Sequence, residues 1–224
     1  MRKLVKKTLN LPESAANEYL YGSTQAGCCA IPMTADDSDT FLVDTAFKLL
    51  SSRDPATADL ARNHLSHTIS RRIQRTPSST EVNEYLSGGM EGDLETSPNE
   101  LRNTWTLARQ ASRRLGIRWE IFPDNATIHI DDASISSFNK SKVVHTIREK
   151  RRGLKAQTRI AKRSQRKAME CVAASRSSSH FLFSGEYTQF ADWRFIHRAR
   201  LNLLPLNGSK PWRTGQNTSC RTCV

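Results

Sequence analysis

The stretch SPNELRNTWTLARQASRRLGIRWEIFPDNATIHIDD, residues 97–132, holds the two patterns that decide the fold. Its first half opens with the capping signature of a helix, Ser97 followed by Pro98 and Glu100. Apolar residues then recur at the helical period: Leu101, Trp105, Ala108, Ala111 and Leu115. Gly116 follows them, as glycine often follows the last residue of a helix. The first half therefore predicts an amphipathic helix that ends at Gly116.

The second half of the stretch has the alternating pattern of strands with one buried face. Apolar residues occupy every second position on both sides of a turn: Ile117, Trp119, Ile121, Ile128 and Ile130. Pro, Asp and Asn at 123–125 supply the turn between them. The pattern predicts a β-hairpin over residues 117–131, with one face packed against the helices.

Three further helices are expected before this stretch. Asp39 is expected to cap the first, and Asp54 with Pro55 to begin the second. Ser78 and Glu81 form a capping box for a short third helix. The second helix has a regular apolar stripe: Ala58, Ala61, Leu65, Ile69 and Ile73. Helices of this kind, joined by short loops, predict a small bundle.

The whole chain is predicted to be mainly α with one small β-hairpin, in four consecutive segments. Residues 1–38 are irregular, and residues 39–133 form the helical bundle with the hairpin. Residues 134–180 are expected to form a basic linker or long helix. Residues 181–224 contain a last helix, expected at 189–203, and two cysteines near the C-terminus.

Nearly all of the net positive charge lies in one stretch, residues 139–167. The 224-residue chain has a formal net charge of +12, and this stretch has twelve cations and one acid, Glu149, which gives +11. The twelve cations are Lys140, Lys142, Arg148, Lys150, Arg151, Arg152, Lys155, Arg159, Lys162, Arg163, Arg166 and Lys167.

A stretch that is almost purely cationic favours a polyanionic partner. We expect it to contact the phosphates of RNA or DNA, with affinity but without sequence selectivity. If it is helical, its length is about 43 Å, which matches several phosphates along a duplex. Arg194, Arg198 and Arg200 on the last helix are expected to add to this surface. Use of the stretch as a nuclear-import signal is compatible with the same pattern.

The cysteines near the C-terminus raise the question of a metal site. Cys220 and Cys223 have the spacing of half a zinc site, and a structural zinc ion needs four ligands. This incomplete pair is expected not to hold zinc tightly, so no cofactor is expected. His64 and His67 lie three residues apart, but packing or surface roles are favoured for them.

Catalytic motifs are weak in this sequence. Asp36 and Asp37 are adjacent, like the metal-binding aspartates of polymerases, but acids are also favoured in the first turn of a helix. The string Phe-Ala-Asp-Trp at 190–193 has one carboxylate within a helical pattern. No phosphate-binding glycine loop or catalytic triad signature is found. We therefore expect a binding protein and no enzyme.

The remaining composition bears on location. No apolar run reaches the ~18 residues of a membrane span, and the charged N-terminus has no apolar segment behind it. Five scattered cysteines favour reduced thiols. A nuclear or cytoplasmic protein that is not secreted and has no membrane partner is expected.

Two long blocks of the sequence carry a family resemblance. LNLPESAANEYLYGSTQAGCCAIPMTADDSDTFLVDTAFKLLSSRDP, residues 9–55, resembles the segment that leads from palm to thumb in the reverse transcriptases of non-LTR retrotransposons. SSSHFLFSGEYTQFADWRFIHRARLNLLPLNG, residues 177–208, resembles the segment that these proteins carry before a Cys-Cys-His-Cys zinc knuckle. In the site-specific elements a restriction-like endonuclease follows. The pair Cys220 and Cys223 then falls where the first two knuckle ligands belong.

The resemblance implies that the chain is the thumb and pre-knuckle part of an RNA-directed DNA polymerase. The helices would lie along the template–primer duplex, and the basic stretch and last helix would hold template RNA or target DNA. The catalytic palm would lie before Met1, and the remaining knuckle ligands and endonuclease after Val224. Those palm and endonuclease domains of the same polyprotein would be its partners.

A second hypothesis is a domesticated or decayed protein-interaction module without a nucleic-acid role. It predicts an apolar surface left bare near the N-terminus, around Leu9, Leu11, Tyr19 and Tyr21. A third, that the chain is expressed without function, also stays open.

Overall fold

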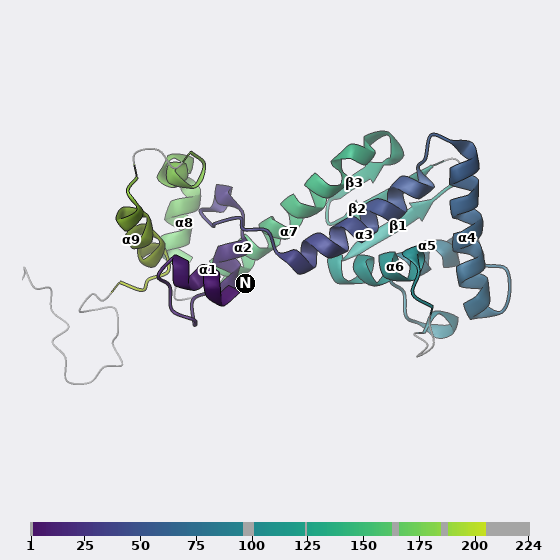
Figure 1. Ribbon diagram of the computed structural model, residues 1–224, viewed down its shortest axis with the longest axis horizontal. Helices are drawn as coiled ribbons and strands as arrows, with labels where there is room; N and C mark the ends of the chain where they lie inside the picture. The colour runs from purple at the N-terminus through teal and green to yellow at the C-terminus, as the bar shows by residue number, and fades with distance from the viewer. Residues whose placement is uncertain (1, 96–100, 124, 163–165, 185–187, 205–224) are drawn as a thin grey trace, which may run out of the picture. The chain divides into compact units, whose positions relative to one another are not determined.

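The computed structural model describes residues 2–95, 101–123, 125–162, 166–184 and 188–204 (Figure 1). They are mainly helical with one small antiparallel sheet, which confirms the predicted fold class. The chain folds as two compact units. Unit 1 comprises Met1–Ile31 and Arg152–Val224, and unit 2 comprises Pro32–Arg151.

This division differs from the four consecutive segments expected from the sequence. Unit 1 combines the two ends of the chain because apolar residues from both fill one core. Leu20 near the N-terminus, Met169 and Leu201 belong to the same buried cluster. Unit 2 has a separate cluster of its own.

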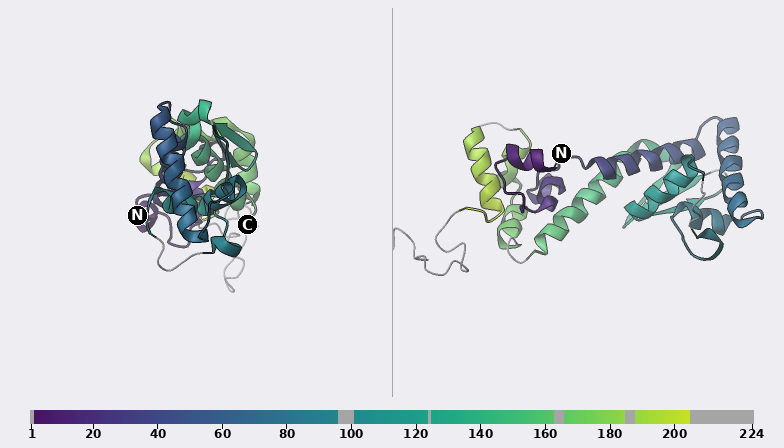
Figure 2. Two further views of the ribbon diagram at one scale, coloured as in Figure 1. Left: turned by 90° about the vertical axis from the view of Figure 1, so that its right-hand side faces the viewer. Right: turned by 60° about the horizontal axis from the view of Figure 1, so that its bottom comes forward.

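Unit 2 contains the hairpin and the predicted bundle helices. Its elements are α3 (Thr34–Leu50), α4 (Pro55–Ile73), α5 (Ser79–Leu86), η2 (Gly92–Leu94), α6 (Thr104–Leu115), β1 (Ile117–Ile121), β2 (Ala126–Ile130), β3 (Ala133–Ser136), η3 (Ser137–Lys142) and the first half of α7 (Val143–Ile160). α3 lies alongside α6, and α5 lies beside β1 (Figures 1 and 2).

The sheet has the order β1-β2-β3, and both pairs are antiparallel. Trp119 pairs with Ile128, and Ile128 pairs with Ile135, so the buried positions of all three strands line one face. The hairpin was predicted, but β3 was not. Four residues, Ala-Ser-Ile-Ser, are too short a run for alternation to indicate a strand.

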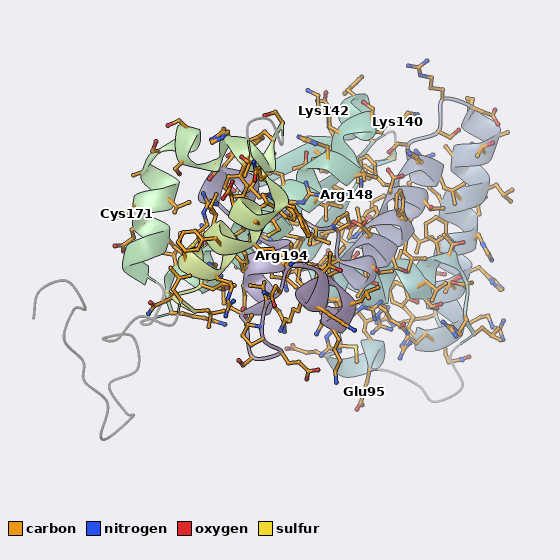
Figure 3. The ribbon with its side chains drawn as sticks, turned by 60° about the vertical axis from the view of Figure 1, so that its left-hand side comes forward. Glu95, Lys140, Lys142, Arg148, Cys171 and Arg194 are labelled. Atoms are coloured by element: carbon orange, nitrogen blue, oxygen red, sulfur yellow. The ribbon has the colours of Figure 1, made fainter. Side chains whose placement is uncertain are left out.

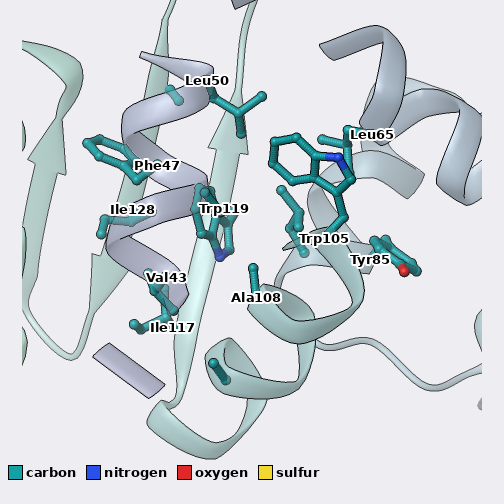
Figure 4. Packing of buried hydrophobic residues seen from close by; sticks show 14 of the residues in the cluster. Val43, Phe47, Leu50, Leu65, Tyr85, Trp105, Ala108, Ile117, Trp119 and Ile128 are labelled. Carbon is teal, nitrogen blue, oxygen red and sulfur yellow. The ribbon is translucent and has the colours of Figure 1, made fainter. Parts of the chain in front are cut away.

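The core of unit 2 forms between α3, α6 and the sheet (Figure 4). Phe47 of α3 packs on Trp119 of β1, with ring centroids 6.0 Å apart. The Trp119 indole donates a 2.7 Å hydrogen bond to Ser112 Oγ on α6, so its one polar group is satisfied inside the core. Trp105 is 1% exposed beside Leu65. The apolar faces predicted for β1, α4 and α6 are thus buried together.

Two helix starts differ from the prediction. α3 begins at Thr34, five residues before Asp39, which is buried within the helix and accepts two 2.7 Å hydrogen bonds from Arg114. α6 begins at Thr104, capped by Asn103 rather than Ser97. The predicted cap at 97–100 lies outside the described residues. The caps of α4 and α5 and the left-handed Gly116 are confirmed.

Unit 1 contains short helices from both ends of the chain. Its elements are α1 (Arg2–Thr8), α2 (Asn17–Tyr21), η1 (Thr24–Ala26), the second half of α7, α8 (Arg166–Ala174), η4 (Arg176–Leu182) and α9 (Phe190–Arg200). The last helix was predicted over 189–203, close to the observed bounds. Tyr19, Leu20 and Leu201 are buried at the centre of unit 1.

Candidate nucleic-acid interface

The basic stretch does not form one uniform cationic arm. Its described residues are helical from Val143 to Ile160, but the chain passes from unit 2 to unit 1 between Arg151 and Arg152, within α7. The cations on either side of that point therefore belong to different units and have different surroundings.

Three cations in the unit 2 half of α7 are paired with acids. Arg148 Nε donates to Asp37 at 2.9 Å, and Arg151 Nε lies 3.3 Å from Asp36 Oδ2. Lys150 pairs with Asp132 on the turn before β3, and this contact lowers the pKa of Asp132. These ion pairs offset the positive charge that the sequence pattern assigned to phosphate binding.

The aspartates that resemble a polymerase motif thus have a structural explanation. Asp36 and Asp37 lie in the first turn of α3, where the helix dipole favours acids, and each holds an arginine of α7. Among the described residues, no group of three or more His, Cys, Asp or Glu could hold a metal ion.

Lys140 and Lys142 lie on η3, before α7 (Figure 3). Lys140 Nζ donates to the carbonyl oxygen of Ser51 at 3.0 Å. Lys142 is exposed, with no ion-pair partner among the described residues. It remains available to a polyanion.

Arg159 is not a phosphate-binding residue, and the prediction for it is wrong. Its side chain is 0% exposed, and its guanidinium lies 4.3 Å from the centroid of the Tyr19 ring. Its Nη2 donates to the carbonyl oxygen of Arg200 at 2.9 Å. Burial lowers the pKa of this arginine from its ordinary value. Arg159 therefore stabilises the interior of unit 1.

Arg200 is likewise wrong as a predicted interface residue, because it is 5% exposed. Its guanidinium donates to the carbonyl oxygens of Gly27 and Ser178 at 2.8 and 2.7 Å, and to Ser179 Oγ at 3.1 Å. Its planar fork joins η1, η4 and α9.

The remaining described cations of the basic stretch are closer to solvent. Lys162 Nζ pairs with Glu18 at 2.7 Å. Partial burial raises the pKa of Glu18, but the hydrogen bond from Lys162 and the charges of Lys162 and Lys155 lower it overall. Arg152 and Lys155 are half-exposed and have no salt bridge to a described residue. They are candidates for phosphate contacts.

Arg194 and Arg198 on α9 are half-exposed, in agreement with the predicted outward face of this helix. Arg194, labelled in Figure 3, has its Cζ 4.5 Å from the centroid of the Phe190 ring. The Nε atoms of both arginines have no hydrogen-bond partner in the part of the chain that the structure describes.

The side chains of five predicted residues are not described. Arg163, Cys220 and Cys223 lie outside the described residues. Arg166 and Lys167 begin α8, but their side chains are not described. The predicted half zinc site and the end of the basic stretch therefore stay predictions.

A cluster of reactive residue types lies inside unit 1. Tyr19 hydrogen-bonds His197 Nδ1, and Cys29 Sγ lies 3.9 Å from the same nitrogen. Burial lowers the pKa of His197 to about 4 and raises the pKa of Cys29 to about 12 and that of Cys28 to about 11. At neutral pH the imidazole is uncharged and both thiols are protonated, so the cluster holds no activated nucleophile.

The surface predicted by the protein-interaction hypothesis is not bare. Leu9 is 4% exposed, Leu11 7% and Tyr19 0%, and Tyr21 packs against the same cluster. These residues form the core of unit 1, together with residues from the C-terminal part of the chain. The bare apolar surface that would have distinguished the protein-interaction hypothesis is therefore not found at these residues.

The two units differ sharply in charge. Unit 1 contains 18 Lys and Arg against 5 Asp and Glu, and unit 2 contains 16 against 17. The net charges are +13 and −1, so the whole excess of +12 belongs to unit 1. The excess of positive charge follows the fold rather than the boundaries of the basic stretch.

None of the described helices combines the length and the apolar character needed to cross a membrane. Comparison of the chain with protein-family models, with curated proteins and with solved structures found no match.

Proposed function

We propose that this chain binds nucleic acid through phosphate contacts made by unit 1. The observation that carries the proposal is the confinement of the net charge, +13, to that unit. Contacts of this kind give affinity that depends on salt and not on sequence, because they neutralise the backbone and release its counterions.

The side chains that support this proposal are exposed or half-exposed in unit 1 and form no salt bridge with a described residue: Arg2, Lys7, Arg152, Lys155, Arg194 and Arg198. Arg148, Lys150 and Arg151 support it less, because each is held by an aspartate of unit 2. The proposed interface is therefore on unit 1, and the basic stretch as a whole does not form it.

The finer proposal is that the chain is the thumb and pre-knuckle part of a non-LTR retrotransposon reverse transcriptase, where it holds template RNA or target DNA. It rests on the resemblance of residues 9–55 and 177–208. It assigns no chemistry to this chain. Extension of a primer by the purified chain with magnesium would contradict that assignment.

A salt titration tests the binding proposal. Affinity for an RNA–DNA hybrid is measured across a range of salt concentrations, and the slope of log affinity against log salt counts the phosphates neutralised, at about 0.9 per phosphate. We expect a slope of several units. A slope near zero would contradict the proposal.

Paired variants locate the surface. Arg152→Gln with Lys155→Gln removes two cations of unit 1, and we expect the slope to fall by about 2. The matched control, Arg53→Gln with Arg71→Gln, removes two exposed cations of unit 2. It changes net charge equally, so an equal fall in slope would show that unit 1 has no special role.

A further inference from the structure

Aromatic side chains lie beside the arginines on the outer face of α9. At ~100° per residue, five side chains of this helix fall within an arc of about 140°: Phe190, Arg194, Arg198, Ala191 and Phe195. Phe195 is 58% exposed and Phe190 is 51% exposed. The opposite face carries the buried Arg200 and the partly buried Trp193 and Ile196. An aromatic and cationic face is thus directed to solvent.

The exposure of Phe195 has a cost that packing does not offset. Large apolar side chains lose favourable free energy when they stay in water. No ring stacking or cation–π contact involves Phe195 among the described residues. Trp193 and Ile196 of the same helix are more buried, so α9 has an inner face on which Phe195 does not lie. Phe195 is therefore a free aromatic plane in the unit with net charge +13.

Phe190 has a different role on this face. Its ring contacts Trp193, with centroids 6.1 Å apart, and supports the guanidinium of Arg194 at 4.5 Å. A guanidinium plane held in this way stacks on nucleic-acid bases as an aromatic ring does. The single acid of α9, Asp192, lies in the first turn, about 60° outside the arc.

From this arrangement we infer that the outer face of α9 binds single-stranded nucleic acid, stacking unpaired bases on Phe195 and on the Phe190–Arg194 pair. Arg198, about one turn beyond Arg194 on the same face, contacts the phosphates. A duplex conceals its base planes, whereas a single strand exposes both bases and backbone. The inference rests on the proposed function, since it names the class of nucleic acid that unit 1 holds.

Stacking and phosphate contact differ in their response to substitution, and this difference provides the test. The full chain is titrated with a short oligothymidylate and with a duplex of the same length. For Phe195→Ala and Phe195→Leu we expect about tenfold weaker binding of the single strand, duplex binding within about twofold, and an unchanged salt slope. Phe195→Trp is expected to retain single-strand binding.

The matched control is Phe122→Ala. Phe122 is 54% exposed, close to the value for Phe195, but belongs to unit 2. We expect this variant to bind both ligands as the parent chain does. Circular dichroism of each variant checks that the fold is kept, which the exposure of both residues favours.

The outcomes separate the two proposals. Salt-dependent binding that is unaffected by Phe195→Ala and Phe195→Leu overturns the stacking inference and leaves the proposed function standing. An equal loss of single-strand and duplex binding also overturns the inference, because stacking on unpaired bases predicts a difference. Absence of salt-dependent binding to either ligand overturns both.

Discussion

Arg152 and Arg159 lie seven residues, about two helical turns, apart on α7, but their surroundings differ. Arg152 is half-exposed, whereas Arg159 is 0% exposed and lies over the Tyr19 ring. Two of its nitrogens, Nε and Nη1, have no hydrogen-bond partner among the described residues. The aromatic ring and the Arg200 carbonyl are what offset the burial of its charge.

This arrangement predicts that Arg159→Ala destabilises unit 1. The substitution leaves a cavity and removes both the cation–π contact and the hydrogen bond to Arg200, for a loss of about 3 kcal/mol. Arg152→Ala, at a half-exposed position, is expected to change stability by less than about 0.5 kcal/mol. Urea unfolding measures both. Equal effects would show that burial does not decide the role of these residues.

The low pKa of His197 predicts that the protein loses stability as the pH falls. Its folded pKa is about 4 against an ordinary value of 6.5. The unfolded chain therefore takes up a proton first as the pH falls. The contribution of the neutral imidazole is complete above pH 6.5, is lost between pH 6.5 and 4, and is constant below. The expected loss is about 3 kcal/mol.

Urea unfolding at a series of pH values checks this, with nuclear magnetic resonance titration of the His197 ring as a direct measurement. His197→Leu is expected to flatten the dependence between pH 6.5 and 4. His145→Gln, at a side chain that is 81% exposed, is expected to keep it. A ring that titrates near 6.5 in the folded protein would contradict the assignment.

At the scale of elements, the sequence predicts those helix starts that depend on capping by neighbouring residues. The caps of α4 and α5 satisfy their own first turns, and both helices begin where Asp54 and Ser78 indicate. The start of α3 was misplaced because Asp39 is held by Arg114, 75 residues away. A capping residue and a buried ion-pair residue look alike in a sequence.

Substitution by alanine is expected to have opposite effects on stability at two glycines, one at the end of α6 and one inside α7. Gly116 has φ +71 at the end of α6, so Gly116→Ala strains the backbone and is expected to cost about 1 kcal/mol. Gly153 lies inside α7, and a Cβ there meets nothing within 4 Å. Gly153→Ala is expected to stabilise by roughly 0.5–1 kcal/mol. Thermal unfolding of the two variants compares them, and shifts of the same sign would contradict the argument.

The pairing of α3 with α7 is also testable. Asp37 and Arg148 are half-buried, at 22% and 35% exposure of their side chains. A double-mutant cycle with Asp37→Asn and Arg148→Gln is expected to give a coupling free energy of about 1 kcal/mol. The exposed pair Lys3 and Glu13 is the control, with an expected coupling near zero. A coupling no larger than that control would contradict a structural role for the pair.

At the scale of the whole molecule, the candidate site could be predicted in part. Composition identified the excess of cations, and the helical period placed Arg194 and Arg198 on an outer face. The partners of Arg148 and Arg151 lie 111 and 115 residues away, so no local pattern reveals that these charges are neutralised. The exposure of Phe195 could have been predicted from the same helical period that places the arginines on the outer face of α9.

The division into two units predicts that unit 2 can fold without unit 1. Residues 32–151 are contiguous and have their own buried cluster. Expressed alone, they are expected to unfold cooperatively in urea, because this core needs no residue from outside the segment. With a net charge of −1 they are expected to show no salt-dependent nucleic-acid binding. Binding by this segment equal to that of the full chain would contradict the assignment to unit 1.

The composition of unit 1 from both ends of the sequence has a consequence for synthesis. Residues 1–31 leave the ribosome before unit 2, but α8 and α9, which hold the partners of Leu20 and Tyr19, end 143 and 169 residues after Ile31. At roughly 5–20 residues per second this delay is on the order of 7–34 s. During that time unit 2 can already fold, while the early segment exposes its apolar side chains. Binding of a nascent-chain chaperone to residues 1–31 is therefore expected until α9 has been synthesised.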